Sequence, residues 1–322
     1  MQSISYNVIN ANNKKEKTMK FLLFSDFHHS AGLFKGGTVE HIKLFEQRAK
    51  ETGCDMMIHA GDFCHGTDHS MDAVEAYNNS EIPTYHCLGN HDSDFTPLSK
   101  VLEAYKMEND YYFFDRGGYR FIVYDTNYIK EEDGSYVHFD VLNYKPKASS
   151  MLYYMPPKEL EWLRETIESS EFPCVLIGHE SIERVDGIKN RDEIMKLIND
   201  ANKKKKHSVI MCINGHYHRD HVSVIENVCY LDVNSTIFDW VENKHELFPE
   251  ELNKSIKYMK HSILYNDPLH AIVTLEGNRI RIEGMESSMF MGITVEMTGN
   301  PKYDRMGREA RPYVGSVDIT LN

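Results

Sequence analysis

The N-terminal third of the chain alternates short apolar segments with stretches of helical spacing, and polar residues follow each apolar segment. Residues 20–25, 55–60 and 82–88 are short enough to be buried strands, whereas 39–52 and 68–77 have helical periodicity. One strand-helix-strand unit takes roughly 30 residues, which matches these intervals. Open α/β folds bind ligands at the carboxyl edge of the sheet. The pattern therefore predicts an α/β fold whose strand ends carry the functional groups.

Further strands and helices are expected along the rest of the chain. In order, they are a hairpin of 111–116 and 120–125, a helix that begins at Pro156 and Pro157, a strand at 173–177, a helix at 191–202, a strand at 207–213 and a hairpin of 222–226 and 229–233. The alternation of residues 270–275, 279–283, 292–297 and 315–320 predicts antiparallel strands.

This distribution of elements suggests one main domain with additions. Residues 1–18 are expected to be a mobile tail, residues 19–285 to form the domain, and residues 286–322 to be a β-rich extension packed on it. Two insertions are expected within the domain. Residues 126–155 are polar and rich in tyrosine and are predicted to be a long loop or lid, and residues 238–262 are predicted to be mostly helical.

The ends of five predicted strands carry Asp, Asn or His side chains. They are Asp26 with His28, Asp62, Asn90 with His91, His179, and His216 with His218. Such a set, with no thiolate, suits borderline or hard divalent metals. Setting His91 aside leaves seven candidate ligands, which exceeds what one ion with open positions needs. Seven suit two ions that share a carboxylate.

At this point the sequence resembles a known family, the calcineurin-like metallophosphoesterases. The segments Asp26-x-His28, Gly61-Asp62, Gly89-Asn90-His91-Asp92, Gly178-His179 and Gly215-His216-x-His218 look like the five ordered motifs of that family, and the resemblance runs from about Lys20 to Val233. It implies a four-layer sandwich of two mixed β-sheets flanked by helices. It also implies one metal ion on Asp26, His28, Asp62 and His218 and a second on Asp62, Asn90, His179 and His216, with Asp62 bridging.

The resemblance implies phosphoester hydrolysis at a dinuclear centre. Two cations clamp the phosphate oxygens, and a bridging hydroxide attacks phosphorus in line with the leaving oxygen. We predict that His91 stabilises the developing charge or protonates the leaving group, with Asp92 fixing its tautomer and orientation. Candidates for substrate contact are Asn90, His91, Tyr217 and Arg219, although a solvated loop arginine is an equally good interpretation of the last of these. The same ligands accept Mn, Fe, Zn or Ni.

Two further features indicate which branch of the family the chain resembles. His65 stands three residues after Asp62, where purple acid phosphatases have a tyrosine ligand, so no tyrosinate-iron colour is expected. The segments Tyr124-Asp125-Thr126-Asn127 and Met155-Pro156-Pro157 are loosely similar to the branch that holds cyclic-nucleotide and other phosphodiesterases.

Charge and cysteine usage exclude several classes of protein. The chain has 36 Lys and Arg against 49 Asp and Glu, a net charge of −13, which disfavours unspecific binding to nucleic acid or to an anionic membrane surface. The six cysteines have no CxxC spacing and favour buried thiols in a reducing compartment. No apolar run approaches a membrane span, and the N-terminus lacks the apolar core of a signal peptide. We therefore expect a cytoplasmic enzyme with a small phosphorylated substrate.

Two rival functions are considered. A nuclease of the same fold is disfavoured by the acidic charge, and a catalytically silent binding or scaffold module is disfavoured because every ligand position and His91 are present. The sequence leaves open whether the substrate is a monoester, a diester, a cyclic nucleotide or a phospholipid head group, and it leaves the oligomeric state open. The choice of substrate is expected to lie in residues 126–155 and 238–262.

Overall fold

The computed structural model describes residues 18–322 except for residues 31, 34 and 242–246, and it contains two mixed six-stranded sheets. The first has the order β16 (Val317–Thr320), β15 (Arg279–Glu283), β14 (Ala271–Glu276), β1 (Thr18–Phe24), β2 (Met56–His59), β3 (Thr84–Tyr85). The second has the order β10 (His221–Ile225), β11 (Val228–Asp232), β9 (Val209–Asn214), β8 (Cys174–Ile177), β5 (Tyr119–Val123), β4 (Tyr112–Arg116). The predicted tail lies outside the described residues except for Thr18, which belongs to β1 and not to a tail.

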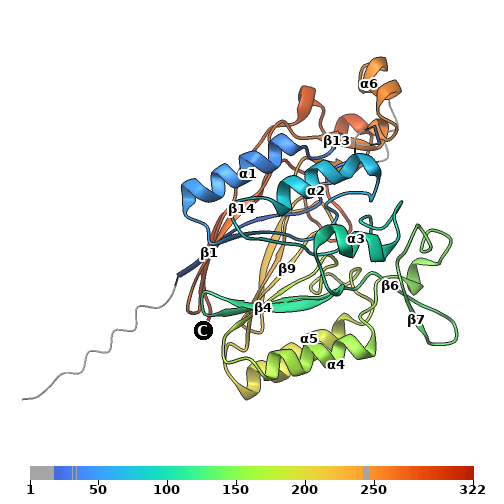
Figure 1. The fold of residues 1–322 in the computed structure, drawn as a ribbon. Helices are drawn as coiled ribbons and strands as arrows, with labels where there is room; N and C mark the ends of the chain where they lie inside the picture. Colours follow the sequence, from blue (N-terminus) through green and yellow to red (C-terminus); the bar gives the residue numbers. More distant parts are fainter. Residues whose placement is uncertain (1–17, 31, 34, 242–246) are drawn as a thin grey trace, which may run out of the picture.

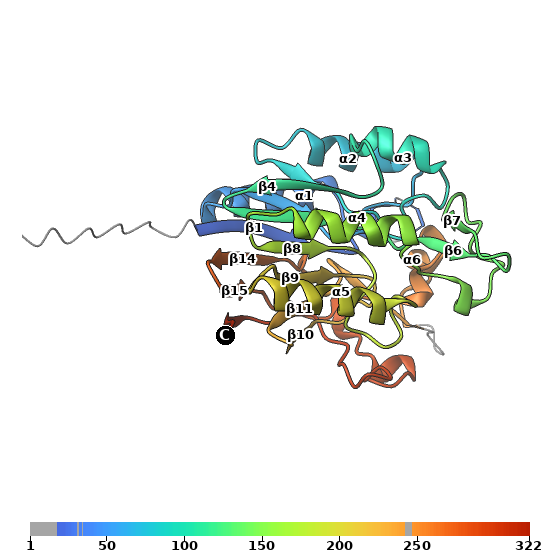
Figure 2. The ribbon, with the colours of Figure 1, turned by 90° about the horizontal axis from the view of Figure 1, so that it is seen from below.

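Helices cover the outer face of each sheet (Figure 1). The first sheet is covered by α1 (Val39–Thr52), α2 (Met71–Asn78) and α3 (Leu98–Tyr105), and the second by α4 (Pro157–Glu168) and α5 (Arg191–Lys204), which lie in front of β8 and β9 in Figure 2. The predicted fold class, two mixed β-sheets between layers of helices, is confirmed.

The pattern of β1 shows why this layering forms. Phe21 and Leu23 point into the core between the two sheets, whereas Leu22 and Phe24 point to the helices on the other side. All four side chains are fully buried, as expected for a strand that is covered on both faces. A continuous apolar run is therefore required there, and the sequence supplies one.

Helix α1 follows its predicted bounds because both ends carry capping residues. The Thr38 hydroxyl accepts a hydrogen bond from the His41 backbone N–H at the N-terminus. Gly53 ends the helix with a φ of 68°, in the left-handed region that favours glycine. Ile42 and Phe45 are buried on one face of the helix, against the first sheet.

Several predictions of secondary structure are wrong. Residues 238–262 are not mostly helical: β12 (Phe238–Trp240) pairs with β13 (Ser262–Leu264), and α6 (Glu250–Ser255) is a single short helix between them. Residues 292–297 form no strand and connect two 3₁₀ turns, Phe290–Gly292 and Glu296–Thr298. Helix α3 was not predicted, although Val101 and Tyr105 on it are buried four residues apart. Residues 126–155 are mostly a long loop, as predicted, and add the short hairpin of β6 (Tyr128–Lys130) and β7 (Tyr136–His138).

None of the helices in the described part of the chain combines the length and the apolar character that a bilayer crossing requires.

Buried ion pairs attach the segment after residue 286 to the rest of the protein. The Arg184 guanidinium, whose side chain is 2% exposed, donates to Asp186 at 2.8 Å and to Asp304 at 2.9 Å. Arg308 pairs with Asp232 and Glu183 in the same region. Removing one partner of such a pair destabilises the protein, because it leaves a buried charge uncompensated.

Replacing Asp186 with asparagine is expected to lower the free energy of unfolding at pH 7 by about 1–3 kcal/mol. Burial raises the pKa of Asp186, but hydrogen bonds from Arg184 and Arg305 outweigh it and lower the pKa to about 2. A depressed folded-state pKa contributes stability above the ordinary value of about 4, and this contribution is lost as pH falls toward 2. Urea denaturation at pH 7 and pH 3 should therefore show a smaller deficit at pH 3. Asp200→Asn, on the exposed face of α5, is the control, and an equal deficit at both pH values would contradict this assignment.

Candidate metal centre

The strand ends that carry the predicted ligands meet at one edge of the two facing sheets. Asp26 follows β1, Asp62 follows β2, His179 follows β8, and His216 follows β9. Five of the seven predicted ligands have a positive φ, between 47° and 69°: Asp26, His28, Asp62, His216 and His218. Non-glycine residues rarely adopt this conformation, and such strained positions cluster at functional sites.

Asp26, His28 and His218 form the first cluster of buried side chains. The His218 Nε2 lies 3.1 Å from Asp26 Oδ1, and the His28 Nε2 lies 3.8 Å from the same oxygen. The other carboxylate oxygen of Asp26 accepts hydrogen bonds from the Ser25 hydroxyl and the His216 backbone N–H. Asp26 Oδ1 has no hydrogen-bond partner although it is buried. An orphaned acceptor next to two imidazoles is the arrangement that a cation would satisfy.

The second cluster consists of Asp62, Asn90, His179 and His216. The His216 Nδ1 lies 2.9 Å from Asn90 Oδ1 and 3.3 Å from His179 Nε2, which in turn lies 3.1 Å from Asp62 Oδ2. Asn90, predicted from the Gly-Asn-His-Asp segment, is therefore brought to the same point as the others. Oxygen and imidazole donors without sulfur suit Mn, Fe, Zn or Ni.

Asp62 lies between the two clusters. Its Oδ2 is 3.7 Å from His28 Nε2 of the first cluster and 3.1 Å from His179 Nε2 of the second. Burial raises the pKa of this carboxyl, but the neighbouring His179 and His91 outweigh it and hold the pKa well below its usual range. Asp62 is thus ionised and placed where one carboxylate can face two ions.

Backbone carbonyls orient two of the imidazoles. The Nδ1 of His179 lies 2.7 Å from the Ala60 carbonyl oxygen, and the Nδ1 of His218 lies 2.8 Å from that of Phe238. A carbonyl oxygen only accepts, so each Nδ1 is protonated, and Nε2 is the nitrogen of each ring that can bind a cation in its cluster. Metal-binding histidines commonly have such a partner.

Two glycines of the motifs are required because other residues of the site lie too close for a side chain at these positions. A Cβ on Gly89 would collide with the backbone and side chain of Asp62, and a Cβ on Gly215 would collide with Ser25 and Asp26. The glycine in each motif therefore leaves room for a carboxylate of the site.

The predicted partner of His91 is wrong. His91 Nδ1 bonds to Asp94 Oδ2 at 2.7 Å, not to Asp92. Asp92 turns the other way and accepts backbone N–H groups of Asp62 and Gly89, at 3.1 Å and 2.7 Å. The turn that follows Asn90 places residues three apart on one side, which brings Asp94 beneath the imidazole. Asp92 thus holds the loops together, and Asp94 orients His91.

Asp94 is fixed by several donors. The Tyr144 hydroxyl donates to it at 2.7 Å, and His65 Nδ1 lies 3.4 Å away. Burial raises the pKa of Asp94, but hydrogen bonds from His65 and His91 outweigh it and lower the pKa to about 2. The carboxylate is ionised at neutral pH and accepts a hydrogen bond from the Nδ1–H of His91. Its Nε2 remains the atom available to a substrate.

The other two candidates for substrate contact have partners within the protein. The Arg219 guanidinium pairs with Asp239, and its side chain is 11% exposed. The Tyr217 hydroxyl donates to the Asp186 carbonyl oxygen at 3.1 Å, and the Arg184 guanidinium lies over its ring. Their contact with substrate stays a prediction.

Glu180 is absent from the residues predicted from the sequence. It is fully buried, its Oε1 has no hydrogen-bond partner, and that oxygen lies 3.0 Å from His216 Nδ1. Glu180 therefore contacts His216 of the second cluster with a buried carboxylate. The sequence feature that points to Glu180 is its position directly after Gly178-His179 at the end of a strand.

The chain matches the family model of the calcineurin-like phosphoesterases over residues 19–220. It belongs to the calcineurin-like phosphoesterase family and is a hydrolase that acts on phosphoester bonds.

A solved structure shares the fold, and a second is reported with it. A dimetal phosphatase from Danio rerio is similar with a TM-score of 0.58 at 11% identity, over 94% of this chain and 99% of that chain. GAP50, the anchor in the inner membrane complex of Plasmodium, is similar with a TM-score of 0.49 at 13% identity, over 95% of this chain and 89% of that one. No curated protein matches the chain.

Proposed function

We propose that the chain hydrolyses a small phosphorylated substrate at a dinuclear metal centre. One ion is held by Asp26, His28, Asp62 and His218, and the other by Asp62, Asn90, His179 and His216. The observation that carries this proposal is the convergence of these seven side chains from strand ends far apart in the sequence, with Asp62 between the two groups. The buried, unpartnered Asp26 Oδ1 fits the same interpretation.

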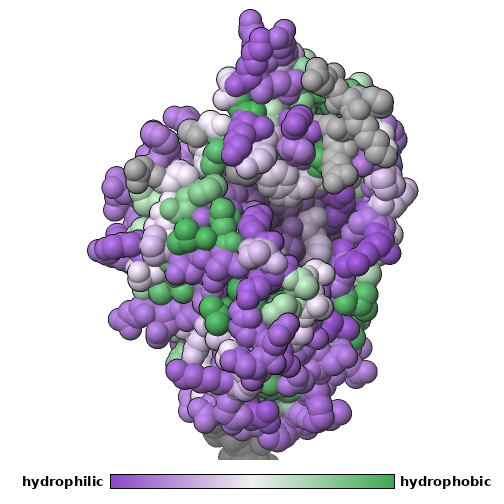
Figure 3. All heavy atoms as spheres, turned by 90° about the vertical axis from the view of Figure 1, so that its right-hand side faces the viewer, coloured by the Kyte–Doolittle hydropathy of each residue, from purple (hydrophilic) through white to green (hydrophobic). Residues whose placement is uncertain are grey.

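The roles of the remaining residues follow from their positions. A pair of ions at these clusters supplies Lewis acidity toward the phosphate and a water of lowered pKa. Hydrolysis adds the hydroxyl of water to phosphorus and breaks the bond to the leaving oxygen. His91, with 18% of its side chain exposed, donates the Nε2 proton of its imidazolium form to that oxygen, while its Nδ1–H stays bonded to Asp94, which holds the ring in place. The face of the molecule where the strand ends lie is hollowed and mostly hydrophilic (Figure 3).

Removing the metal is expected to abolish hydrolysis reversibly. The protein is stripped with a chelator and assayed with bis(4-nitrophenyl) phosphate, a diester, and 4-nitrophenyl phosphate, a monoester, after addition of Mn, Fe, Zn or Ni in turn. We expect no turnover above background without metal and recovery with at least one ion. An unchanged rate after chelation, or no hydrolysis of either ester with any ion, would contradict the proposal.

A further inference from the structure

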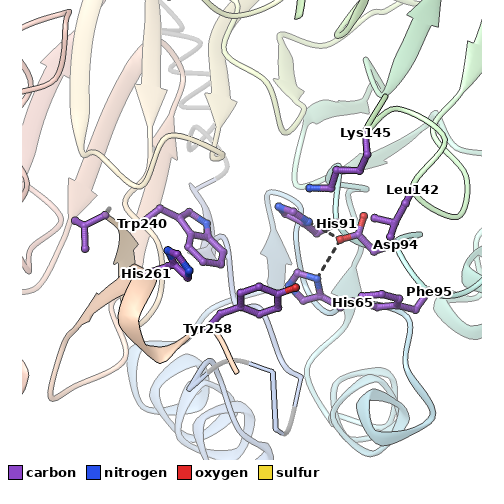
Figure 4. A pocket seen from close by; sticks show the side chains of 10 residues that line it. His65, His91, Asp94, Phe95, Leu142, Lys145, Trp240, Tyr258 and His261 are labelled. Atoms are coloured by element: carbon purple, nitrogen blue, oxygen red, sulfur yellow. Dashed lines mark hydrogen bonds and ion pairs between the residues drawn. The ribbon is translucent and has the colours of Figure 1, made fainter. Parts of the chain in front are cut away.

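A pocket of about 620 Å³ opens beside His91 and lies between the two segments that the sequence predicts to choose the substrate. Trp240, Tyr258 and His261 come from the 238–262 segment, and Leu142 and Lys145 come from the 126–155 segment. Figure 4 shows the two groups facing each other across the pocket, with His91 and Asp94 at its inner side. Since His91 is the proposed donor to the leaving oxygen, the pocket is where the leaving group lies.

Lys145 places a cationic group in this pocket, although the whole chain is acidic. Lys145 extends over His91 into the space in front of Trp240 (Figure 4), and it has no carboxylate partner among the described residues. Asp94 is the one carboxylate among the described lining residues, and it is already engaged by His65, His91 and Tyr144. An ammonium group without a counter-charge in a concave site favours an anionic ligand.

The walls of the pocket are aromatic. Trp240 and Tyr258 form one side, and Phe95, 45% exposed, lies on the other. Aromatic side chains that line a pocket offer stacking surfaces to a planar group. Aromatic side chains combined with a lysine are the combination that holds a ring and a neighbouring negative charge together.

We infer that this pocket selects a leaving group that carries a second negative charge next to a planar ring, with Lys145 binding the charge and Tyr258 and Trp240 stacking on the ring. The inference rests on the proposed function, because it assumes that the leaving group lies beside His91. The second charge is a phosphate, as in a nucleotide, or a carboxylate.

Matched pairs of substrates separate these features. Adenosine 5′-diphosphate has a leaving group with a ring and a phosphate, adenosine 5′-monophosphate has the ring alone, and pyrophosphate has the charge alone. The pair of 3-carboxyphenyl phosphate and phenyl phosphate tests a carboxylate in the same way. Hydrolysis of the diphosphate uses one water and releases phosphate and the nucleoside monophosphate. We expect the wild type to hydrolyse the substrate whose leaving group carries the second negative charge about tenfold better in kcat/KM than its uncharged counterpart, in at least one of the two pairs. The pair that shows this preference tells whether the bound anion is a phosphate or a carboxylate.

Lys145→Ala is expected to reduce this preference about tenfold by raising the KM of the charged substrate, since the loss of one hydrogen bond between charged groups weakens binding by about that factor. Lys147→Ala is the matched control, because Lys147 lies on the same segment but pairs with Glu131 at 2.6 Å outside the pocket. Tyr258→Leu is expected to reduce the preference for the diphosphate over pyrophosphate about fivefold, because stacking of the ring on Tyr258 is lost.

The outcomes distinguish this inference from the proposed function. If the metal-loaded protein hydrolyses the nitrophenyl esters but prefers neither charged member, or keeps its preference in Lys145→Ala, the inference is overturned and the hydrolase remains. If no ester is hydrolysed with any metal, the proposed function itself fails.

Discussion

Asp62→Asn is expected to lose both metal ions and to lower kcat/KM by at least about 10³-fold. The Asp62 Oδ2 lies within 4 Å of an imidazole of each cluster, as does Asp26 Oδ1, and Asp62 is the carboxylate that we propose as the bridge. A neutral amide neither compensates two cations nor bridges them with equivalent oxygens, and bridging carboxylates are what hold two-metal hydrolytic sites together. Metal content per chain, measured by mass spectrometry after gel filtration, and hydrolysis of bis(4-nitrophenyl) phosphate report the two effects.

Asp55→Asn is the control for this variant. Asp55 lies at the opposite end of β2, is exposed, and accepts the Lys20 backbone N–H. It should keep the metal content and the rate of the wild type. An Asp62→Asn protein that retains two ions per chain and most of its activity would contradict the bridging role.

His91→Ala is expected to lower kcat by about 10²–10⁴-fold while both ions stay bound, because general acid catalysis contributes that much. The imidazole lies outside both clusters, so its removal leaves their ligands intact. Asp94→Asn should lower kcat by about 10–100-fold through the orientation of His91. Steady-state rates at saturating substrate and metal content are the measurements.

Asp92→Asn distinguishes the role of Asp92 from that of Asp94. Since Asp92 binds backbone N–H groups of Asp62 and Gly89 and not His91, its replacement should lower the melting temperature more than Asp94→Asn does. A His91→Ala protein with a kcat within twofold of the wild type, or an Asp94→Asn protein with unchanged kcat, would remove these roles.

The core of the site could be predicted from the sequence because it depends on local order. A strand that ends in a polar residue brings that residue to the sheet edge, and this holds for Asp26, Asp62 and His179 without knowledge of the tertiary structure. Helix α1 could be predicted to the residue because Thr38 and Gly53 mark its ends.

The missed features depend on geometry that a sequence pattern does not encode. The direction of one turn decides which carboxylate bonds to His91. The sequence pattern alone does not distinguish the neighbouring Asp92 from Asp94, which is the actual partner. Glu180 contacts His216 only because the ends of β8 and β9 are adjacent. Residues 238–262 have too little periodicity to distinguish a hairpin with one short helix from a helical insertion.

The most direct test of the dinuclear centre is a crystal structure of the metal-loaded protein with anomalous scattering recorded at the edge of the bound metal. Two anomalous peaks about 3.5–4 Å apart are expected, one beside Asp26, His28 and His218 and the other beside Asn90, His179 and His216, with Asp62 between them. A single peak, or peaks away from these side chains, would contradict the account.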